Sequence, residues 1–357
     1  MSAPATRFVL PDGLSATEPP EERGLARDGV RLLVARSDAE PEHRVFTDLP
    51  DALAPGDLVV VNTSDTEPAA VDGVRDDGRP VVLHVSGPHR AGGLVVELRT
   101  PDGLRVRDAR AGERVHLPAG VTATLSAAVP GAAPGRLWRA ALPVEGGVRA
   151  WLAATGRPIT YSHLHGHRPI AAHRTVFAAP VPGEFGSAEM PSAGRPFTAA
   201  VLDGLRRRGV ATASLVLHTG VSSPEAGETP LPERFRVPGA TAAAVEEARA
   251  RGGRVVAVGT TATRALEAAT GPDGRVRAAG GWTDLVLGPD RPARVVDGLV
   301  TGWHEPEASH LLLLEAVAGP ELVGRAYAAA VERRYRWHEF GDSCLLLPGP
   351  VTTRRGP

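Results

Sequence analysis

The sequence predicts an α/β protein of two parts: a helix-covered, largely parallel sheet or barrel, and a smaller all-β module. Short apolar runs punctuated by turn residues fill the stretch from about 70 to 150, and helix and strand patterns alternate from about 198 onward. A chain of 357 residues is long enough for about two domains, and 42% hydrophobic residues supply a core for each.

The stretch from about 70 to 150 predicts short antiparallel strands. Its apolar runs are separated by turn signals such as Pro101-Asp102-Gly103. We expect the strands of a small barrel or sandwich at 81–85, 94–98, 121–125 and 137–142.

The second half of the chain alternates between helix and strand patterns. Thr198 is placed to cap a helix that stops at Gly209, and a later helix begins at Thr241 and ends at Gly252. We expect further helices after Gly259, near Pro306 and near Pro320, and strands at 213–218, 254–258, 285–287, 295–300 and 343–347.

Composition narrows the function classes. The 40 basic residues, all arginine, and 41 acidic residues leave a net charge of −1, so nucleic-acid contact is expected only at a local patch. The absence of lysine excludes Schiff-base chemistry and a P-loop lysine, and the lone Cys344 excludes a disulfide framework and a thiolate zinc site. No apolar run is long enough to span a bilayer and no apolar signal core opens the chain, so we expect a cytoplasmic protein.

The segment VAVGTTATRALE is the strongest local indication of a ligand site. A buried strand ends at Gly259, and Thr260 and Thr261 open a helix whose free N–H groups favour an anion or an oxygen-rich ligand. Ligands of open α/β sheets gather at such strand ends, where Arg264 is placed to bind a carboxylate or phosphate with two hydrogen bonds. The structural alternative is that a threonine merely caps the helix and Arg264 is an exposed partner of Glu267.

Two other loops are candidate ligand contacts. The segment PSAGRPFT (191–198) carries Arg195 just before a helix, where a glycine-containing loop brings backbone close to a ligand. The segment TGWHEPE (301–307) follows a strand, so Trp303 is placed to stack on a base and His304 to titrate near neutrality. The alternative for the second segment is that Trp303 is a core residue and His304 a helix cap.

Alternating histidines raise the question of a metal. His163, His165 and His167 would share one face of a strand and, with the nearby His173, are of the type that binds Zn²⁺ or Fe²⁺. Gly166 and the flanking prolines favour a loop, and no carboxylate ligand accompanies the histidines, so we predict no metal site. G-x-S-x-G, G-x-G-x-x-G and H-E-x-x-H motifs are absent. The residues alone predict a two-part enzyme with an anion-binding pocket.

Short segments found in the same order along nearly the whole chain carry a family resemblance. They are FVLP (8–11), RDGVRLLV (27–34), FTDLP (46–50), PGDLVVVNT (55–63), RTVFA (174–178), PSAGRPFT (191–198), LHTG (217–220), VGTTATRALE (258–267), GGWTDL (280–285), LVTGWHEP (299–306), YRW (335–337) and GDSCLL (341–346). Together they resemble the S-adenosylmethionine:tRNA ribosyltransferase-isomerase family of queuosine biosynthesis. Such a collinear set is more specific than any one motif.

The resemblance implies a barrel-like α/β main domain over residues 1–70 and 150–357, with a small β-barrel inserted at 71–149. It also implies that S-adenosylmethionine is a ribosyl-donating co-substrate, with no cofactor and no metal. In the family, the sulfonium acidifies the adjacent ribose carbon, and a base opens the sugar and expels adenine. The aminomethyl group of the tRNA base 7-aminomethyl-7-deazaguanine then adds, and epoxide closure displaces methionine to give epoxyqueuosine.

The family motifs map onto individual residues of this chain. His218, His304 and Asp284 are the implied catalytic residues. The implied substrate-binding residues are Ser192, Gly194, Arg195, Phe197, Gly220, Gly259, Thr260, Thr261, Arg264 and Trp303. Among these, the VGTT corner and Arg264 are expected to hold the methionine carboxylate or the ribose hydroxyls of the donor.

Some positions depart from the family pattern. Arg195-Pro196 replaces Leu-His, Glu305 replaces Leu, Glu307 replaces Lys, and the stretch 64–71 lacks two arginines. The expected partner is a tRNA anticodon loop, and the protein is expected to be a monomer or homodimer. Each lost cation weakens phosphate binding, so two alternative functions stay open. One is a relative that uses S-adenosylmethionine on a small-molecule acceptor, with Glu305 or Glu307 pairing an amine. The other is a non-catalytic nucleoside- or RNA-binding module.

Overall fold

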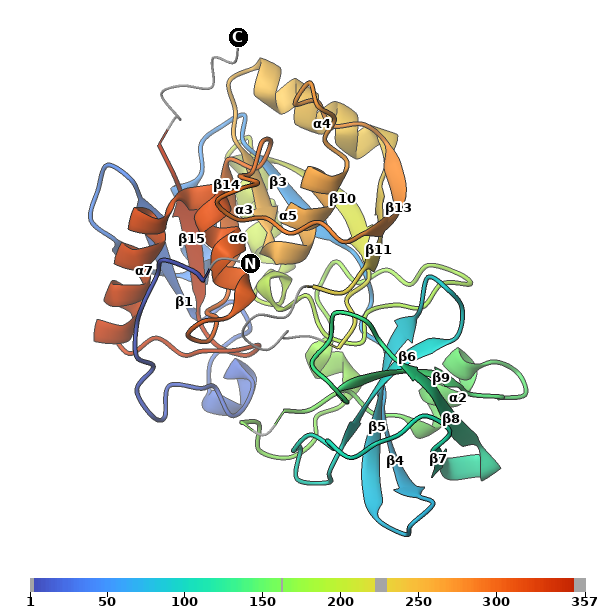
Figure 1. The fold of residues 1–357 in the computed structure, drawn as a ribbon. Coiled ribbons are helices and arrows are strands. Elements are labelled where there is room, and N and C mark those ends of the chain that lie inside the picture. The colour runs from blue at the N-terminus through green and yellow to red at the C-terminus, as the bar shows by residue number, and fades with distance from the viewer. Residues whose placement is uncertain (1–2, 162, 222–229, 350–357) are drawn as a thin grey trace.

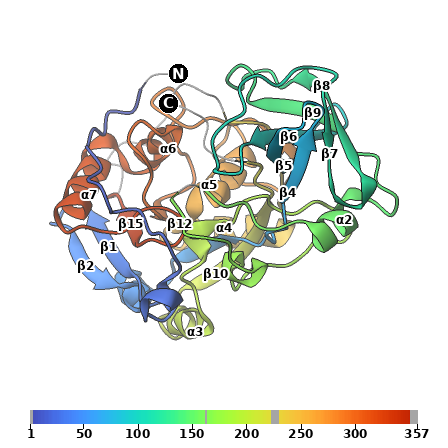
Figure 2. The ribbon, with the colours of Figure 1, turned by 90° about the horizontal axis from the view of Figure 1, so that it is seen from below.

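The computed structural model describes residues 3–161, 163–221 and 230–349. Within these ranges the strands form a nine-stranded sheet and a closed six-stranded barrel. Figures 1 and 2 show the barrel beside the larger α/β part of the molecule. No helix of the described ranges is long and apolar enough to cross a membrane.

The large sheet is mixed, with a parallel centre. Its strands are β1 (Arg31–Arg36), β2 (Glu42–Val45), β3 (Leu58–Asn62), β10 (Ala211–Leu217), β11 (Glu233–Val237), β12 (Val255–Val258), β13 (Ala279–Thr283), β14 (Gly298–Thr301) and β15 (Ser343–Leu347). Their order across the sheet is β13-β11-β10-β3-β12-β14-β15-β1-β2. The four neighbours β10, β3, β12 and β14 are parallel, so their carboxyl ends share one edge of the sheet.

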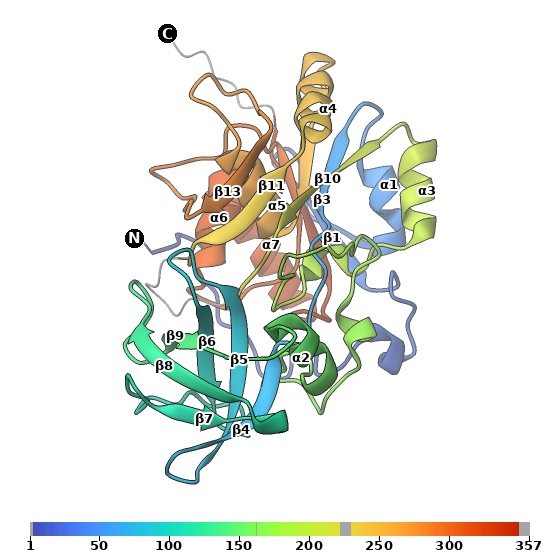
Figure 3. The ribbon, with the colours of Figure 1, turned by 90° about the vertical axis from the view of Figure 1, so that its right-hand side faces the viewer.

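Helices cover both faces of this sheet. One face carries α4 (Gly239–Ala250), α5 (Gly259–Ala268), α6 (Ser309–Ala318) and α7 (Pro320–Glu332), and the other carries α1 (Leu49–Ala52) and α3 (Ala199–Arg207). Figure 3 shows α1 and α3 on the opposite side of the sheet from α5 and α6. Along β3, Leu58 and Val60 enter one core while Val59 and Val61 enter the other, because strand side chains alternate. The central strands are therefore apolar along their whole length.

The inserted barrel closes in the order β4-β5-β6-β9-β8-β7. Its strands are β4 (Ala70–Arg75), β5 (Pro80–Pro88), β6 (Leu94–Arg99), β7 (Arg114–His116), β8 (Thr122–Ala128) and β9 (Leu137–Ala141). Trp151 and Leu152 of α2 (Val148–Thr155) join the apolar core of the barrel. Short 3₁₀ helices lie at Pro20–Arg23, Phe46–Asp48, Pro118–Gly120, Ile170–His173 and Ser192–Gly194.

The expected α/β class and the small barrel are confirmed. The barrel-like main domain differs from a closed barrel because its sheet has two edge strands, β13 and β2. The Thr198 cap is also confirmed, since its hydroxyl accepts the Val201 N–H at the start of α3.

Two strand predictions need correction. Residues 285–287 form no strand, because their apolar side chains pack from a loop that follows β13. Val295 and Val296 lie outside β14, since their N–H groups are bound by the Glu267 carboxylate instead of a neighbouring strand.

Candidate active site

A cavity of about 910 Å³ lies where the carboxyl ends of the parallel strands meet the barrel. This is the edge at which open α/β sheets bind their ligands. The cavity is lined by nine of the predicted site residues: Ser192, His218, Gly220, Gly259, Thr260, Thr261, Arg264, Trp303 and His304.

The corner between β12 and α5 presents a helix N-terminus to this cavity. Gly259 turns the chain with a φ of 83°, and a Cβ there would lie 3.3 Å from that of Ala193, so the position requires glycine. Asn62, at the end of β3, fixes the corner by donating to Thr261 Oγ1 at 3.2 Å and to the Leu217 carbonyl at 2.8 Å. The N–H groups of this first turn are thus held in place for an oxygen-rich ligand.

Arg264 projects from α5 and is buried. Its Nε donates to the Leu285 carbonyl at 3.1 Å and its Nη1 pairs with Glu233 of β11. Burial raises the pKa of Glu233 above its usual range, against the opposing effect of the Arg264 charge. The Arg264 Nη2 is buried with no hydrogen-bond partner among the described residues. Arg264 lines the cavity, and Nη2 is the guanidinium nitrogen for which the described residues provide no partner.

The structural alternative for this segment is wrong on two points. Arg264 is 8% exposed and does not pair with Glu267. Glu267 is itself buried and accepts hydrogen bonds from the N–H groups of Arg294, Val295 and Val296. It organises the chain before β14, while Arg264 faces the cavity.

The neighbouring corner, after β14, contributes His304 and His310 to the cavity lining. Thr301 Oγ1 lies 3.1 Å from the Gly302 carbonyl oxygen and 3.2 Å from His304 Nε2. A hydroxyl that donates to this carbonyl accepts from Nε2–H, which leaves Nδ1 as the lone-pair nitrogen of the ring. The His304 ring stacks on His310 with centroids 4.6 Å apart. Burial, and then the nearby His310, holds the pKa of His304 well below its usual value, so the imidazole is neutral at neutral pH.

His218 reaches the cavity with both ring nitrogens occupied. Nδ1 lies 2.8 Å from Ser64 Oγ, which in turn lies 2.7 Å from Ser187 Oγ, and Nε2 lies 3.2 Å from the Glu184 carboxylate. Burial lowers the pKa of His218 despite the hydrogen bond to Glu184. This ring is held rigidly but offers no unoccupied nitrogen.

Four predicted residues lie outside the cavity lining. Arg195 is 3% exposed, pairs with Glu21 and lies over the Phe340 ring. Phe197 packs in the core against Phe46, and Gly194 is buried beside Phe177. Asp284 is exposed. These positions stabilise the surroundings of the cavity or face solvent.

Two lining residues have packing roles. Trp303 is 2% exposed and packs on Tyr327 and Trp337, so its faces are not free to stack on a base. A Cβ at Gly220 would lie 2.3 Å from Ser86 Oγ of the barrel, so glycine permits the close approach of the two domains there.

The acidic residues at positions that depart from the family pattern form ion pairs within the molecule. Asp65 holds Arg174 with contacts of 2.8 and 3.0 Å. Glu305 pairs with His338 at 2.9 Å, and the exposed Glu307 lies 3.6 Å from Arg7. Neither glutamate is therefore left unpaired for the amine of a small-molecule acceptor.

The alternating histidines do not converge. His163 pairs with Glu339 and stacks on His338, whereas His165 is exposed. In the described ranges no group of three or more His, Cys, Asp or Glu side chains is arranged to hold a metal ion.

Sequence reasoning missed Asn62, Glu184 and His310. Asn62 lies in the segment PGDLVVVNT and ends β3, so a polar residue at the end of a buried strand was the available signal. Glu184 and His310 stand in segments without a motif and reach the site only through tertiary contacts.

Comparison with known proteins decides the family. The family described as queuosine biosynthesis protein matches residues 5–346. The chain belongs to this family. A relative from Symbiobacterium thermophilum, named S-adenosylmethionine:tRNA ribosyltransferase-isomerase, is 36% identical over 95% of this chain and 98% of its own length. A relative of the same name from Anaeromyxobacter sp. is 37% identical over 95% of this chain and 97% of its own length.

The fold has a solved counterpart. A crystal structure of an S-adenosylmethionine tRNA ribosyltransferase from Thermotoga maritima is 28% identical, with a TM-score of 0.53. The match covers 96% of this chain and 99% of that one. The predicted family, its α/β fold and its enzyme class, a transferase and isomerase of tRNA modification, are confirmed.

Proposed function

We propose that this family member transfers and isomerises the ribosyl group of S-adenosylmethionine onto 7-aminomethyl-7-deazaguanine in the anticodon loop of tRNA. The products are epoxyqueuosine, adenine and methionine. One observation carries the proposal: an anion-binding corner and a neutral histidine open into the same cavity, at the ligand edge of the family's sheet. We place the reaction in the cytoplasm, with S-adenosylmethionine as co-substrate and no cofactor.

The corner between β12 and α5 is the proposed donor site. Its N–H groups and the free Nη2 of Arg264 suit the methionine carboxylate or the ribose hydroxyls. Glu233 balances the buried guanidinium, so Arg264 stays folded in the cavity wall before a ligand arrives. Thr260 and Thr261 lie in the same first turn and supply hydroxyl groups.

His304 is the proposed base. Its Nδ1 lone pair takes a proton from the ribose carbon beside the sulfonium, and the electron pair left on carbon opens the sugar and expels adenine. The amine of the acceptor base then adds to the sugar, and closure of the epoxide breaks the carbon–sulfur bond and releases methionine. His218, whose nitrogens are already bonded, is a positioning residue in this scheme.

The decisive experiment supplies both substrates. The protein is incubated with S-adenosylmethionine and a tRNA that carries the aminomethyl-deazaguanine, and adenine, methionine and the mass of the anticodon base are measured. The proposal requires that adenine and methionine are released and that the mass of the anticodon base increases. If adenine forms no faster than in a blank without protein, the proposed enzymatic activity is refuted. If adenine is released with a small amine but not with the tRNA, the small-molecule alternative is supported.

A further inference from the structure

One tryptophan stands apart from the others. The sequence has five, and Trp282 is 37% exposed while the remaining four are at most 7% exposed. Trp282 lies on the edge strand β13 and borders the cavity. An exposed aromatic ring at the border of a cavity is placed to stack on a planar group of a ligand.

Trp282 faces away from the proposed donor corner. Across the antiparallel pair, Glu233 lies opposite Thr283 and Arg234 opposite Trp282. The Glu233 side chain reaches Arg264 of α5, and Thr283 is buried. Because neighbouring strand residues point to opposite faces, Arg234 and Trp282 project from the other face of the strand pair. A nucleoside held at the α5 corner is thus on the far side of this strand pair from the Trp282 ring.

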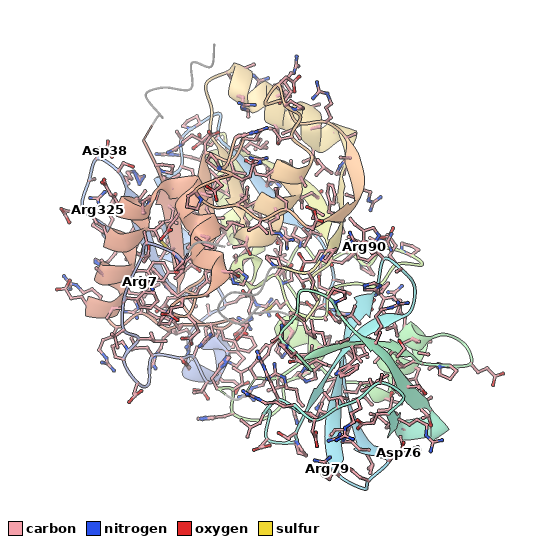
Figure 4. The ribbon with its side chains drawn as sticks, viewed as in Figure 1. Arg7, Asp38, Asp76, Arg79, Arg90 and Arg325 are labelled. Carbon is pink, nitrogen blue, oxygen red and sulfur yellow. The ribbon has the colours of Figure 1, made fainter. Side chains whose placement is uncertain are left out.

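Two arginines border the same cavity as Trp282. Arg234 is beside Trp282, 37% exposed, and lies 3.4 Å from Glu184. Arg90 also borders the cavity and is exposed on the turn between β5 and β6. Figure 4 places Arg90 at the end of the barrel nearest the main domain, and Arg79 and Asp76 at the far end.

The turn that carries Arg90 is braced. His89 N–H donates to the Gly93 carbonyl at 2.9 Å, and Arg139 Nη2 donates to the carbonyls of Ala91 and Gly92 at 3.1 Å. Its position at the cavity edge is therefore set before a partner binds, which reduces the entropy lost on binding.

We propose that Trp282 is a stacking platform for an unpaired base of an RNA loop, next to the base that enters the cavity, with Arg90 contacting the adjoining phosphate. An exposed aromatic face with nearby guanidinium groups suits single-stranded RNA, whose bases are splayed and whose backbone is anionic. The inference rests on the proposed function, because it takes the acceptor to be an RNA loop. It adds the recognition of a neighbouring nucleotide.

The test uses an RNA stem-loop whose loop carries the fluorescent base 2-aminopurine beside the target guanine. Trp282→Ala weakens binding of the stem-loop about 5- to 100-fold, the effect of losing one base stack, and removes the fluorescence change caused by stacking. Trp282→Phe retains a ring and binds within about threefold of the parent protein. Arg90→Ala lowers the slope of log affinity against log salt by about one.

Two matched variants serve as controls. Val74→Ala shortens an exposed apolar side chain of the barrel outside the cavity lining, and Arg206→Ala removes an 80% exposed arginine of α3. Both bind the stem-loop as the parent does. The proposal is overturned if Trp282→Ala binds the stem-loop like Val74→Ala. It is also overturned if Trp282→Ala weakens S-adenosylmethionine binding and leaves RNA binding unchanged. These are binding measurements, so failed turnover with modified tRNA would contradict the proposed function alone.

Discussion

Two neighbouring strand ends build the cavity wall in opposite ways. The corner after β12 uses charge, because a buried guanidinium and a helix N-terminus remain polar with Glu233 beside them. The corner after β14 uses uncharged rings, because burial lowers the pKa of His304 and His310 and keeps both imidazoles in the neutral form. One edge of the sheet thus places a charged corner next to a neutral, imidazole-lined one. The difference lies in whether each buried group has a counterion.

The largest expected effect is at the histidine corner. His304→Gln keeps a hydrogen bond to Thr301 but removes the basic nitrogen, so the rate of adenine release falls about 10²- to 10⁴-fold. Single-turnover kinetics with saturating S-adenosylmethionine measure this loss. His165→Gln, at an exposed histidine outside the cavity lining, serves as control. Equal rates for the two variants would remove His304 from the chemistry.

The next largest effect is a loss of stability at Glu267, which lies on the same helix, α5, as the proposed ligand-binding residue Arg264. Glu267→Ala leaves three N–H donors of the chain before β14 without an acceptor, which lowers the free energy of unfolding by about 3–5 kcal/mol. Urea unfolding measures the change. Arg264→Ala, three residues earlier, also unpairs Glu233, so Arg264→Ala with Glu233→Gln is the variant expected to act mainly on ligand affinity. If urea unfolding shows Glu267→Ala to be as stable as the parent, its assigned structural role is wrong.

Arg264→Ala weakens S-adenosylmethionine binding by about 1.5–3 kcal/mol, the range for a hydrogen bond to a charged group. Titration calorimetry gives the affinity directly. The variant also leaves Glu233 buried without its cation, so Arg264→Ala with Glu233→Gln is the matched control for that charge. Unchanged affinity in both variants would contradict the donor site.

The smallest effect is the contribution of His310 to the pH dependence of stability. Burial lowers the pKa of His310 to about 4, from 6.5 for an unperturbed histidine. As pH falls below about 6.5, the unfolded chain takes up a proton that the folded chain does not, so stability is lost on acidification. His310 accounts for a loss of about 1–2 kcal/mol between pH 6.5 and 5, and His310→Gln removes that loss. Unfolding curves measured across this range test it, with His165→Gln expected to retain the parent's pH dependence.

Local patterns predicted much of the fold. Four of the six barrel strands (β5, β6, β8 and β9), the strand Ser343–Leu347 and the Thr198 cap each follow from a short periodic or capping signal. The barrel strands β4 and β7 were not predicted. Residues 285–287 are as apolar as a strand but pack from a loop, and nothing in their own sequence distinguishes the two outcomes.

The cavity was predicted less completely. The VGTT corner carries its own signal, since glycine and hydroxyl residues open a helix directly after a buried strand. Glu233, Glu184 and His310 acquire roles only when distant strands and helices meet. The same limit applies to Arg195, because sequence does not show that Glu21 and Phe340 enclose it.

Gly220 lies directly against Ser86 of barrel strand β5, with no side chain between them. A methyl group at position 220 would sit 2.3 Å from the serine oxygen, so the Ser86 side chain would have to rotate and give up the hydrogen bond that it accepts from the Val221 N–H. That bond ties the segment after β10 to the barrel. The join between the two walls of the cavity therefore depends on the absence of a side chain at this one position.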